Sequence, residues 1–226
     1  NRNGESSPTH ELGPIAKVLN INRGNRMVSL VSMASKAAGI HEFLKREKGD
    51  SYDLTNAQFA QGDVITTMIK CAHGQTIVLT LDTTLPRGYS RGFRVQGTKA
   101  MYLEDNKSLF LDQTHNKFDF TWKEQWNNVE EYREQYDHPI WKQYQKEGIH
   151  AGHDGMDWLV FSAFKKGSQV PIDVYDMASW MAVTALSEES IAKGSAPVMF
   201  PDFTDGKWLN PAPVVRGHYC LDEICE

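Results

Sequence analysis

The feature that most constrains the fold of this chain is a pair of alternating runs in its first half. Val64 to Cys71 and Thr76 to Leu81 are rich in threonine and branched aliphatic residues at a period of two, a pattern typical of half-buried strands. The connecting residues, Ala72-His73-Gly74-Gln75, suit a tight turn. The sequence therefore predicts an antiparallel hairpin with one buried face and one face left for water, a partner or a ligand.

Further strands extend this antiparallel pattern. Met27 to Met33 alternates apolar and small polar residues and is predicted to be a half-buried strand. Phe93 to Gln96 and Lys99 to Leu103 form a second predicted strand pair, closed by a turn at Gly97-Thr98. Leu109 to Leu111 is a short strand that extends this pair. Successive hairpins indicate a largely antiparallel sheet.

Helices are predicted around these strands. A short helix is expected from Ile40 to Lys48, where His41 has no partner in the sequence and is assigned to the surface. Pro171 to Trp180 is predicted to be a capped helix, and a second capped helix is expected to start after Ser187 and to end at Gly194. The predicted fold class is therefore α+β, a largely antiparallel open sheet with helices packed on one face.

Near the start of the chain, a short amphipathic helix is predicted with Thr9 as its N-cap. Pro14 is expected in its first turn, the part of a helix that tolerates proline. Its apolar face comprises Leu12, Ile15, Ala16 and Leu19. His10 falls in the opening turn, where the positive end of the helix dipole disfavours the imidazolium form. Such a ring suits a proton acceptor or a clamp on a polar substrate, although a histidine in a first helical turn more often bonds to local backbone or meets solvent.

Residues 119 to 147 are rich in Trp and Tyr at spacings of about three to five, which predicts one or two helices with an aromatic stripe. Such a stripe can form a sugar-binding platform, because aromatic faces stack on the apolar faces of sugars. The pattern favours the other interpretation, in which these rings pack in a core or a subunit contact.

Two histidines, His150 and His153, lie three residues apart and are followed by the acids Asp154 and Asp157. This spacing is compatible with a metal site. A glycine-rich entry to a helix explains the segment without an ion and is the favoured interpretation, with Asp154 or Asp157 as a cap and an apolar stripe that ends at Gly167. We predict the helix and no metal.

Composition excludes some function classes. A net charge of −5 and a pI near 5.9 argue against a nucleic-acid partner. No apolar stretch is long enough to cross a bilayer and no signal peptide is visible, so the compartment is left open. Among the cysteines, Cys71 is predicted to be a buried strand residue, whereas Cys220 and Cys225 are spaced for a small-loop disulfide.

A dinucleotide fold is not predicted within this chain. The sequence contains no G-x-G-x-x-G followed by a helix, and parallel βαβ alternation is absent.

Several ordered motifs resemble one family of enzymes. Arg2-Asn3-Gly4 followed by Pro8-Thr9-His10 is similar to the pattern R-N-G-x-x-Y-P-T-H-G-L-G-P-I, and Pro86 to Arg91 is similar to P-R-x-Y-S-R. The chain also has counterparts of V-Y-D-x-A-x-W and P-D-F-T-x-G-x-W. Together they resemble the C-terminal domain of the NAD-dependent α-N-acetylgalactosaminidases, glycoside hydrolases of the wider Gfo/Idh/MocA group. Ser7 stands where the pattern has tyrosine, and Asp154 where a related G-G-H-G-G-M-D motif has glycine.

The resemblance implies a C-terminal substrate-binding and oligomerisation domain over residues 1–226, with the N-terminal dinucleotide-binding domain absent from this chain. It implies a carbohydrate substrate, an NAD cofactor held mainly by that missing domain, and a homo-oligomer formed through the sheet face. It assigns His10 and Tyr89 to catalysis and Arg2, Ser7 and Thr9 to substrate binding. For Tyr89, Arg87 and Arg91 are candidate cations that would make the phenol a better base.

The chemistry implied is one of the exceptions to the two-carboxylate glycosidase scheme. Removal of hydride from carbon 3 of the sugar acidifies the proton on carbon 2, a base removes that proton, the group on carbon 1 leaves, water adds and the hydride returns. Two alternatives stay open: an NAD(P)-dependent sugar oxidoreductase, and a non-catalytic assembly or carbohydrate-binding module.

Overall fold

The computed structural model describes residues 2–148, 153–167 and 170–213, and the chain forms two compact units. The first unit comprises Asn1–Gly88 and Asp173–Ala212, and the second contains Tyr89–Ile172.

The first unit is built on a four-stranded antiparallel sheet in the order β3-β2-β1-β7. Its strands are β1 (Met27–Ala34), β2 (Val64–Cys71), β3 (Thr76–Asp82) and β7 (Val198–Met199). The predicted hairpin is β2 and β3, in which Thr67 pairs with Leu79 and Ile69 with Ile77. The period of two in the sequence thus correctly predicted this hairpin.

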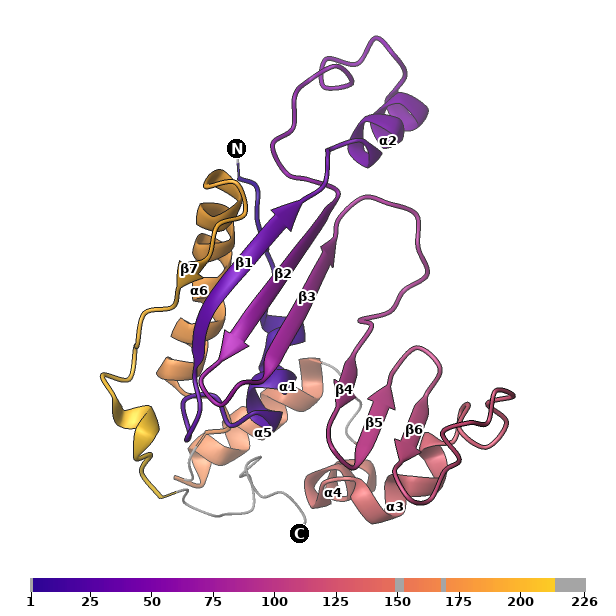
Figure 1. Cartoon of the computed structure of the whole chain (residues 1–226), viewed down its shortest axis with the longest axis vertical. Helices are drawn as coiled ribbons and strands as arrows, with labels where there is room; N and C mark the ends of the chain where they lie inside the picture. Colours follow the sequence, from indigo (N-terminus) through magenta and orange to yellow (C-terminus); the bar gives the residue numbers. More distant parts are fainter. Residues whose placement is uncertain (1, 149–152, 168–169, 214–226) are drawn as a thin grey trace. The chain divides into compact units, whose positions relative to one another are not determined.

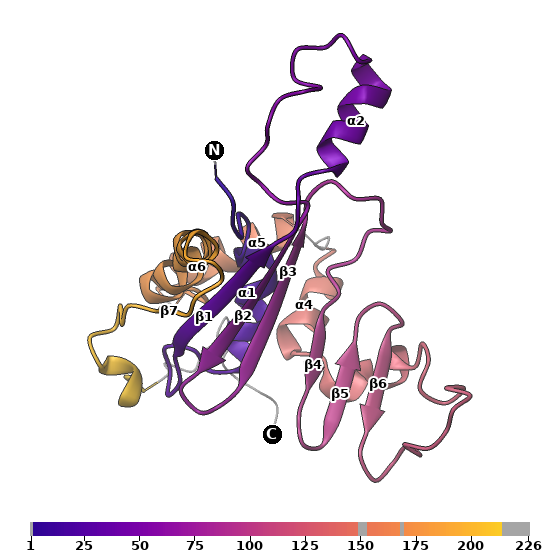
Figure 2. The ribbon, with the colours of Figure 1, turned by 45° about the horizontal axis from the view of Figure 1, so that its top comes forward.

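One face of this sheet is covered by helices. Helix α1 (Thr9–Val18) and helix α6 (Val174–Ala192) lie on the same side of the strands (Figures 1 and 2), and that face buries Leu30, Ile65, Ile69, Ile77 and Leu79. The α+β class, with open antiparallel sheets, is therefore confirmed.

The register of β1 decides which of its residues are buried. A bulge between Met27 and Ser29 changes the alternation, so that Leu30 and Ser32 face the helices while Val31 faces away. Ser32 is buried without penalty because its N–H donates to Ser190 Oγ at 2.9 Å and its hydroxyl lies 2.8 Å from Thr67 Oγ1.

Helix α6 is one continuous helix, so the prediction of two capped helices after residue 171 is wrong. Asp173 accepts from the Asp176 N–H, and Asp176 accepts from the Asp173 N–H, which is a reciprocal capping box. Ser187 lies inside the helix and donates to the Thr184 carbonyl at 2.9 Å instead of capping a new one.

Helix α1 starts differently from the prediction. Its N-cap is Pro8, with no side-chain capping bond, and Thr9 is already the first helical residue. Pro14 therefore lies in the interior, where it removes the N–H that would bond to the carbonyl four residues earlier. Packing compensates: an added Cβ on Gly13 would lie 3.4 Å from the Trp180 ring, so the helix sits close against α6.

The predicted helix after β1 is confirmed as α2 (Gly39–Lys48), in an excursion between β1 and β2. His41 is not simply a surface residue. Its Nδ1 lies 2.9 Å from the Thr55 carbonyl oxygen, and its ring contacts Phe59 edge-on with centroids 5.3 Å apart. The partners lie beyond the helix, so local sequence could not reveal them.

The second unit contains a separate three-stranded antiparallel sheet in the order β4-β5-β6. These strands are β4 (Arg94–Gln96), β5 (Ala100–Leu103) and β6 (Ser108–Leu111), close to their predicted positions. They form a sheet of their own instead of extending the first one.

The helices of the second unit are η1 (Val129–Tyr132), α3 (Arg133–Tyr136), α4 (Pro139–Lys146) and α5 (His153–Lys165). The predicted helical stripe over 119–147 is confirmed only in part, because residues 119–128 have no regular helix. Helix α5 begins before Asp154 and Asp157, so neither residue is its N-cap. Ile140, Tyr144, Leu159 and Ala163 form the small buried core between α4 and α5.

Near the end of the described chain, Asp202 is a turn residue. Its carboxylate accepts from the Thr204 and Gly206 N–H groups and from Trp208 Nε1, just before the 3-10 helix η2 (Lys207–Leu209).

Cys71 is buried in β2 as predicted, and burial raises the pKa of its thiol to about 11. Cys220 and Cys225 lie outside the described residues. Among the described helices, none combines the length and apolarity needed to cross a membrane.

Candidate functional site

His10 is the second residue of α1, in the helical first turn where the sequence placed it. Its side chain is exposed and makes no hydrogen bond to any described residue. The imidazole is therefore accessible and uncommitted at a helix start, as a substrate-contacting histidine must be.

The residues predicted to line the same pocket lie just before it. Ser7 is exposed, and Thr9 is half-buried. The Arg2 Nε lies 2.9 Å from Glu188 Oε1 of α6, so this guanidinium is already ion-paired. Ser7 and Thr9 thus offer hydroxyl groups close to His10 in sequence, whereas the charge of Arg2 is balanced within the fold.

The segment that precedes α1, residues 2–8, is tied down by hydrogen bonds; we call it the strap. The Glu5 N–H donates to Ser187 Oγ at 2.8 Å, which fixes the strap to α6. An added Cβ on Gly4 would lie 2.7 Å from Glu188 Cγ, so this approach requires glycine. The strap that leads to His10 is therefore held by contacts with α6 and not by α1 alone.

Two glutamates near the start of α1, Glu5 and Glu11, were not predicted to be buried from the sequence. Glu5 is 2% exposed, and burial raises its pKa, with a further increase from the nearby charge of Glu11. Glu11 Oε2 is buried without a hydrogen-bond partner among the described residues. An acid at the third helical position normally accepts the N-cap N–H, which Pro8 lacks. The only signal in the sequence was the position of Glu11 relative to Pro8; the polar run around Glu5 gave no sign of burial.

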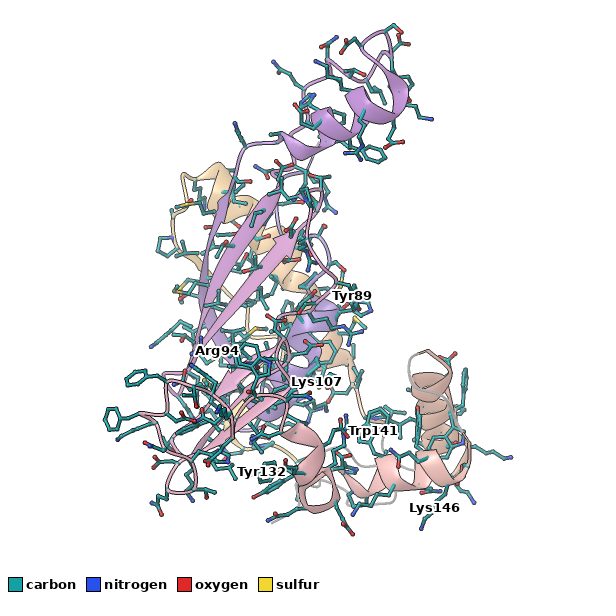
Figure 3. All side chains as sticks on the ribbon, turned by 90° about the vertical axis from the view of Figure 1, so that its right-hand side faces the viewer. Tyr89, Arg94, Lys107, Tyr132, Trp141 and Lys146 are labelled. Atoms are coloured by element: carbon teal, nitrogen blue, oxygen red, sulfur yellow. The ribbon has the colours of Figure 1, made fainter. Side chains whose placement is uncertain are left out.

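Tyr89 begins the second unit, and its side chain is 88% exposed (Figure 3). Arg87, one of the two cations proposed to activate it, has its Nε 3.5 Å from Asp82 Oδ2. Arg91 is exposed. Arg87 is thus at least partly engaged by a carboxylate, which weakens its case as the cation for Tyr89.

His10 and Tyr89 belong to different units of the chain. Each is exposed within its own unit, which a shared pocket would require. Their convergence on one substrate stays a prediction.

A shallow hollow of about 250 Å³ lies in the first unit beside the α1–β1 loop and the β2–β3 turn. Arg23, one of its lining residues, is held by Asp176 at 2.7 Å and by Asp173 at 3.2 Å, so its charge is neutralised. None of the predicted site residues lines this hollow. We therefore do not place the active site there.

Within the described residues, no group of three or more His, Cys, Asp or Glu side chains could hold a metal ion. His150 lies outside the described residues, and only the backbone of His153 is described, so the histidine pair cannot be placed as a ligand set.

The chain is similar to curated proteins over nearly its whole length. The alpha-N-acetylgalactosaminidase of Tannerella forsythia is 41% identical over 216 residues, which cover 94% of this chain and 45% of the relative. A glycosyl hydrolase family 109 protein of Parabacteroides distasonis is 42% identical with the same coverage. A protein of the same description from Stenotrophomonas maltophilia is 42% identical over 218 residues. The chain spans about half the length of these relatives.

A family model for the glycosyl hydrolase 109 C-terminal domain matches residues 1–210. This match includes the strap, α1, both sheets and α6, and so covers every residue predicted for the site. The chain therefore belongs to the glycosyl hydrolase 109 family, as its C-terminal domain.

Proposed function

We propose that this chain is the substrate-binding part of a glycosidase that hydrolyses N-acetylgalactosaminide-type sugars. The observation that supports this most is the exposed imidazole of His10 on the helical first turn, which makes no hydrogen bond to the described residues, within a domain whose relatives include an alpha-N-acetylgalactosaminidase. In this proposal, His10 accepts or holds a proton at the sugar, and the hydroxyls of Ser7 and Thr9 bind sugar hydroxyls. Tyr89 is the second proton-transfer group.

The described residues do not fit a nicotinamide cofactor by themselves. A dinucleotide fold needs parallel strands joined by crossover helices, whereas all pairs of named strands here are antiparallel. We therefore propose that any NAD used by the enzyme is bound by a part of the protein outside this chain.

The test is His10→Ala in the full-length enzyme, with release of N-acetylgalactosamine as the assay. We expect turnover to fall at least tenfold, because a positioned proton acceptor contributes about 10²–10⁴-fold. His73→Ala is the matched control: His73 is exposed in the β2–β3 turn of the same unit, and its replacement should leave turnover unchanged. An unchanged rate for His10→Ala would remove His10 from the chemistry.

The same assay separates the glycosidase from the sugar oxidoreductase alternative. Sugar release without net NADH supports the glycosidase, and net accumulation of NADH would contradict it in favour of a dehydrogenase.

We further propose that the uncovered face of the first sheet is a contact between copies of the protein. On this face Val31 pairs with Met68 and Met68 with Val78, an apolar row across three strands whose members are 36%, 55% and 55% exposed. Met33 and Met199, both 63% exposed, widen it. Contiguous exposed apolar surface of this kind marks association sites.

Met68→Lys should reduce the molar mass measured by light scattering to that of the monomer, because it places a charge in the middle of the row. Met181→Lys is the control, since Met181 is similarly exposed but lies on α6. An unchanged oligomer in Met68→Lys would place the contact elsewhere.

A further inference from the structure

The three residues that connect the α2 excursion to β2 are hydrogen-bonded on two sides; we call Gln61, Gly62 and Asp63 the junction. All contacts described below lie within the first unit. They join segments that are far apart in sequence.

On one side, the junction holds the strap. The Gln61 side-chain amide accepts from the Gly4 N–H at 3.2 Å and donates to the Gly4 carbonyl at 3.1 Å. The Gly62 N–H donates to Asn3 Oδ1 at 3.0 Å. Gln61 thus pairs with Gly4 as a neighbouring strand would, six residues before His10.

On the other side, the junction holds the loop that follows β3. The Thr83 N–H donates to the Asp63 carbonyl at 2.9 Å, and Thr84 Oγ1 donates to Asp63 Oδ1 at 2.6 Å. This loop, residues 83–88, leads directly to Tyr89 in the sequence.

The carboxylate of Asp63 also fixes the start of the α2 excursion. Its Oδ2 accepts from the Ala38 and Gly39 N–H groups at 2.8 and 2.9 Å. Burial acts to raise the pKa of Asp63, but the hydrogen bonds from Thr84, Gly39 and Ala38 outweigh it and lower the pKa below its usual value. Asp63 is therefore a charged acceptor, and hydrogen bonds to a charged acceptor are stronger than those between neutral groups.

Close backbone approach leaves the junction little freedom to shift. An added Cβ on Gly62 would lie 2.4 Å from the Ser35 carbonyl oxygen, and one on Gly39 would lie 2.7 Å from Thr84 Oγ1. Only glycine fits at these two positions without rearrangement.

We propose that the junction is a positioning element for the glycosidase reaction, with Gln61 fixing the segment that precedes His10 and Asp63 fixing the segment that precedes Tyr89. Both are positioning residues, since they act through the backbone and not on the sugar. This proposal rests on the proposed function. Misplacement of a reacting group by about 1 Å can cost on the order of 10²-fold in rate, so both residues should matter for turnover.

The test compares Gln61→Leu, which removes both bonds to Gly4, with Gln61→Glu, which keeps an acceptor for the Gly4 N–H. In the full-length enzyme we expect kcat to fall tenfold or more in Gln61→Leu and less in Gln61→Glu, with KM for the sugar little changed. Gln58→Leu is the matched control, because Gln58 is exposed three residues earlier in the same excursion. Equal kcat values in Gln61→Leu and Gln58→Leu would overturn the proposal.

Hydrogen exchange gives a second measurement that does not depend on the reaction. Gln61→Leu should speed exchange at the Gly4 amide, which donates to the Gln61 side chain, but not at the Ala38 and Gly39 amides. Asp63→Asn should do the reverse, because it weakens the carboxylate that accepts from Ala38 and Gly39. Exchange unchanged in both regions would overturn the anchoring roles even if activity fell. If only the proposed function is wrong, His10→Ala should keep full activity while the two variants still show this selective exchange pattern.

Discussion

The two units of the chain each contain an antiparallel sheet, but the two sheets are covered differently. In the first unit, α1 and α6 bury one whole face of the strands. In the second unit, no apolar side chain of β4, β5 or β6 is fully buried. The one buried residue of these three strands is the polar Ser108. The second unit instead relies on polar side chains: Asn128 accepts from the Leu109 N–H at 2.8 Å and donates to its carbonyl at 2.9 Å. The Asn128 amide therefore bonds to both backbone groups of Leu109 in the edge strand β6, as the Gln61 amide bonds to both backbone groups of Gly4 in the strap.

The second unit also exposes its aromatic residues. Phe118, Phe120 and Trp126 are 68%, 87% and 59% exposed, whereas Tyr144 is buried against Trp158 with ring centroids 5.2 Å apart. Trp141 lies on α4, the helix that also carries Tyr144, and Tyr132 is the last residue of η1 (Figure 3). Aromatic content alone therefore does not predict a core.

The largest difference between the two units is expected when an arginine ion pair is removed from each. Arg23→Ala removes two bonds of 2.7 Å to Asp176, which is 1% exposed, and should cost about 3–5 kcal/mol of unfolding free energy, because a buried carboxylate loses its main partner. Arg133→Ala in the second unit also breaks contacts to two acids, but the Arg133 side chain is 50% exposed and those of Glu130 and Asp137 are 65% and 28% exposed, so about 0.5 kcal/mol or less is expected. Denaturant titration measures both. Equal losses would mean that burial does not distinguish the two units.

A smaller effect is expected from Glu5→Gln. Since burial raises the pKa of Glu5, the folded state binds its proton more tightly than the unfolded state. The contribution of Glu5 to the unfolding free energy is complete below its pKa in the unfolded chain, about 4.3. It is lost as the pH rises through the raised pKa of Glu5 in the folded state. Glu5→Gln should therefore stabilise the protein by about 1 kcal/mol at pH 7 and by nothing at pH 4.

Glu131→Gln is the control for that change, because Glu131 is exposed in the second unit. Thermal unfolding at both pH values should show no difference from the natural chain. A gain in Glu5→Gln that is the same at pH 4 and pH 7 would contradict the account of Glu5.

The smallest effect is expected from Phe120→Ser. Phe120 is 87% exposed, so its removal should change the unfolding free energy by no more than about 0.5 kcal/mol. The same substitution at Phe200, which is 5% exposed in the first unit, should cost about 3–5 kcal/mol. A large loss in Phe120→Ser would show that the exposed rings of the second unit pack after all.

The strands were predicted well because a strand depends on alternation and on turn residues, which are local. His10 was placed correctly in a first helical turn for the same reason. The errors have a common cause: Pro8 displaced Thr9 as the N-cap, and Ser187 stayed inside α6, because packing against distant segments outweighed local capping signals.

The antiparallel class, most strand positions and the motifs that identify the family could be predicted from the sequence, since these depend on residues close together in the chain. Three features depend on the folded chain: the burial of Glu5, the pairing of Gln61 with Gly4, and the bonds of the α6 serines to the sheet and the strap. These contacts join residues 57 to 182 positions apart, and no local pattern in a single sequence specifies them.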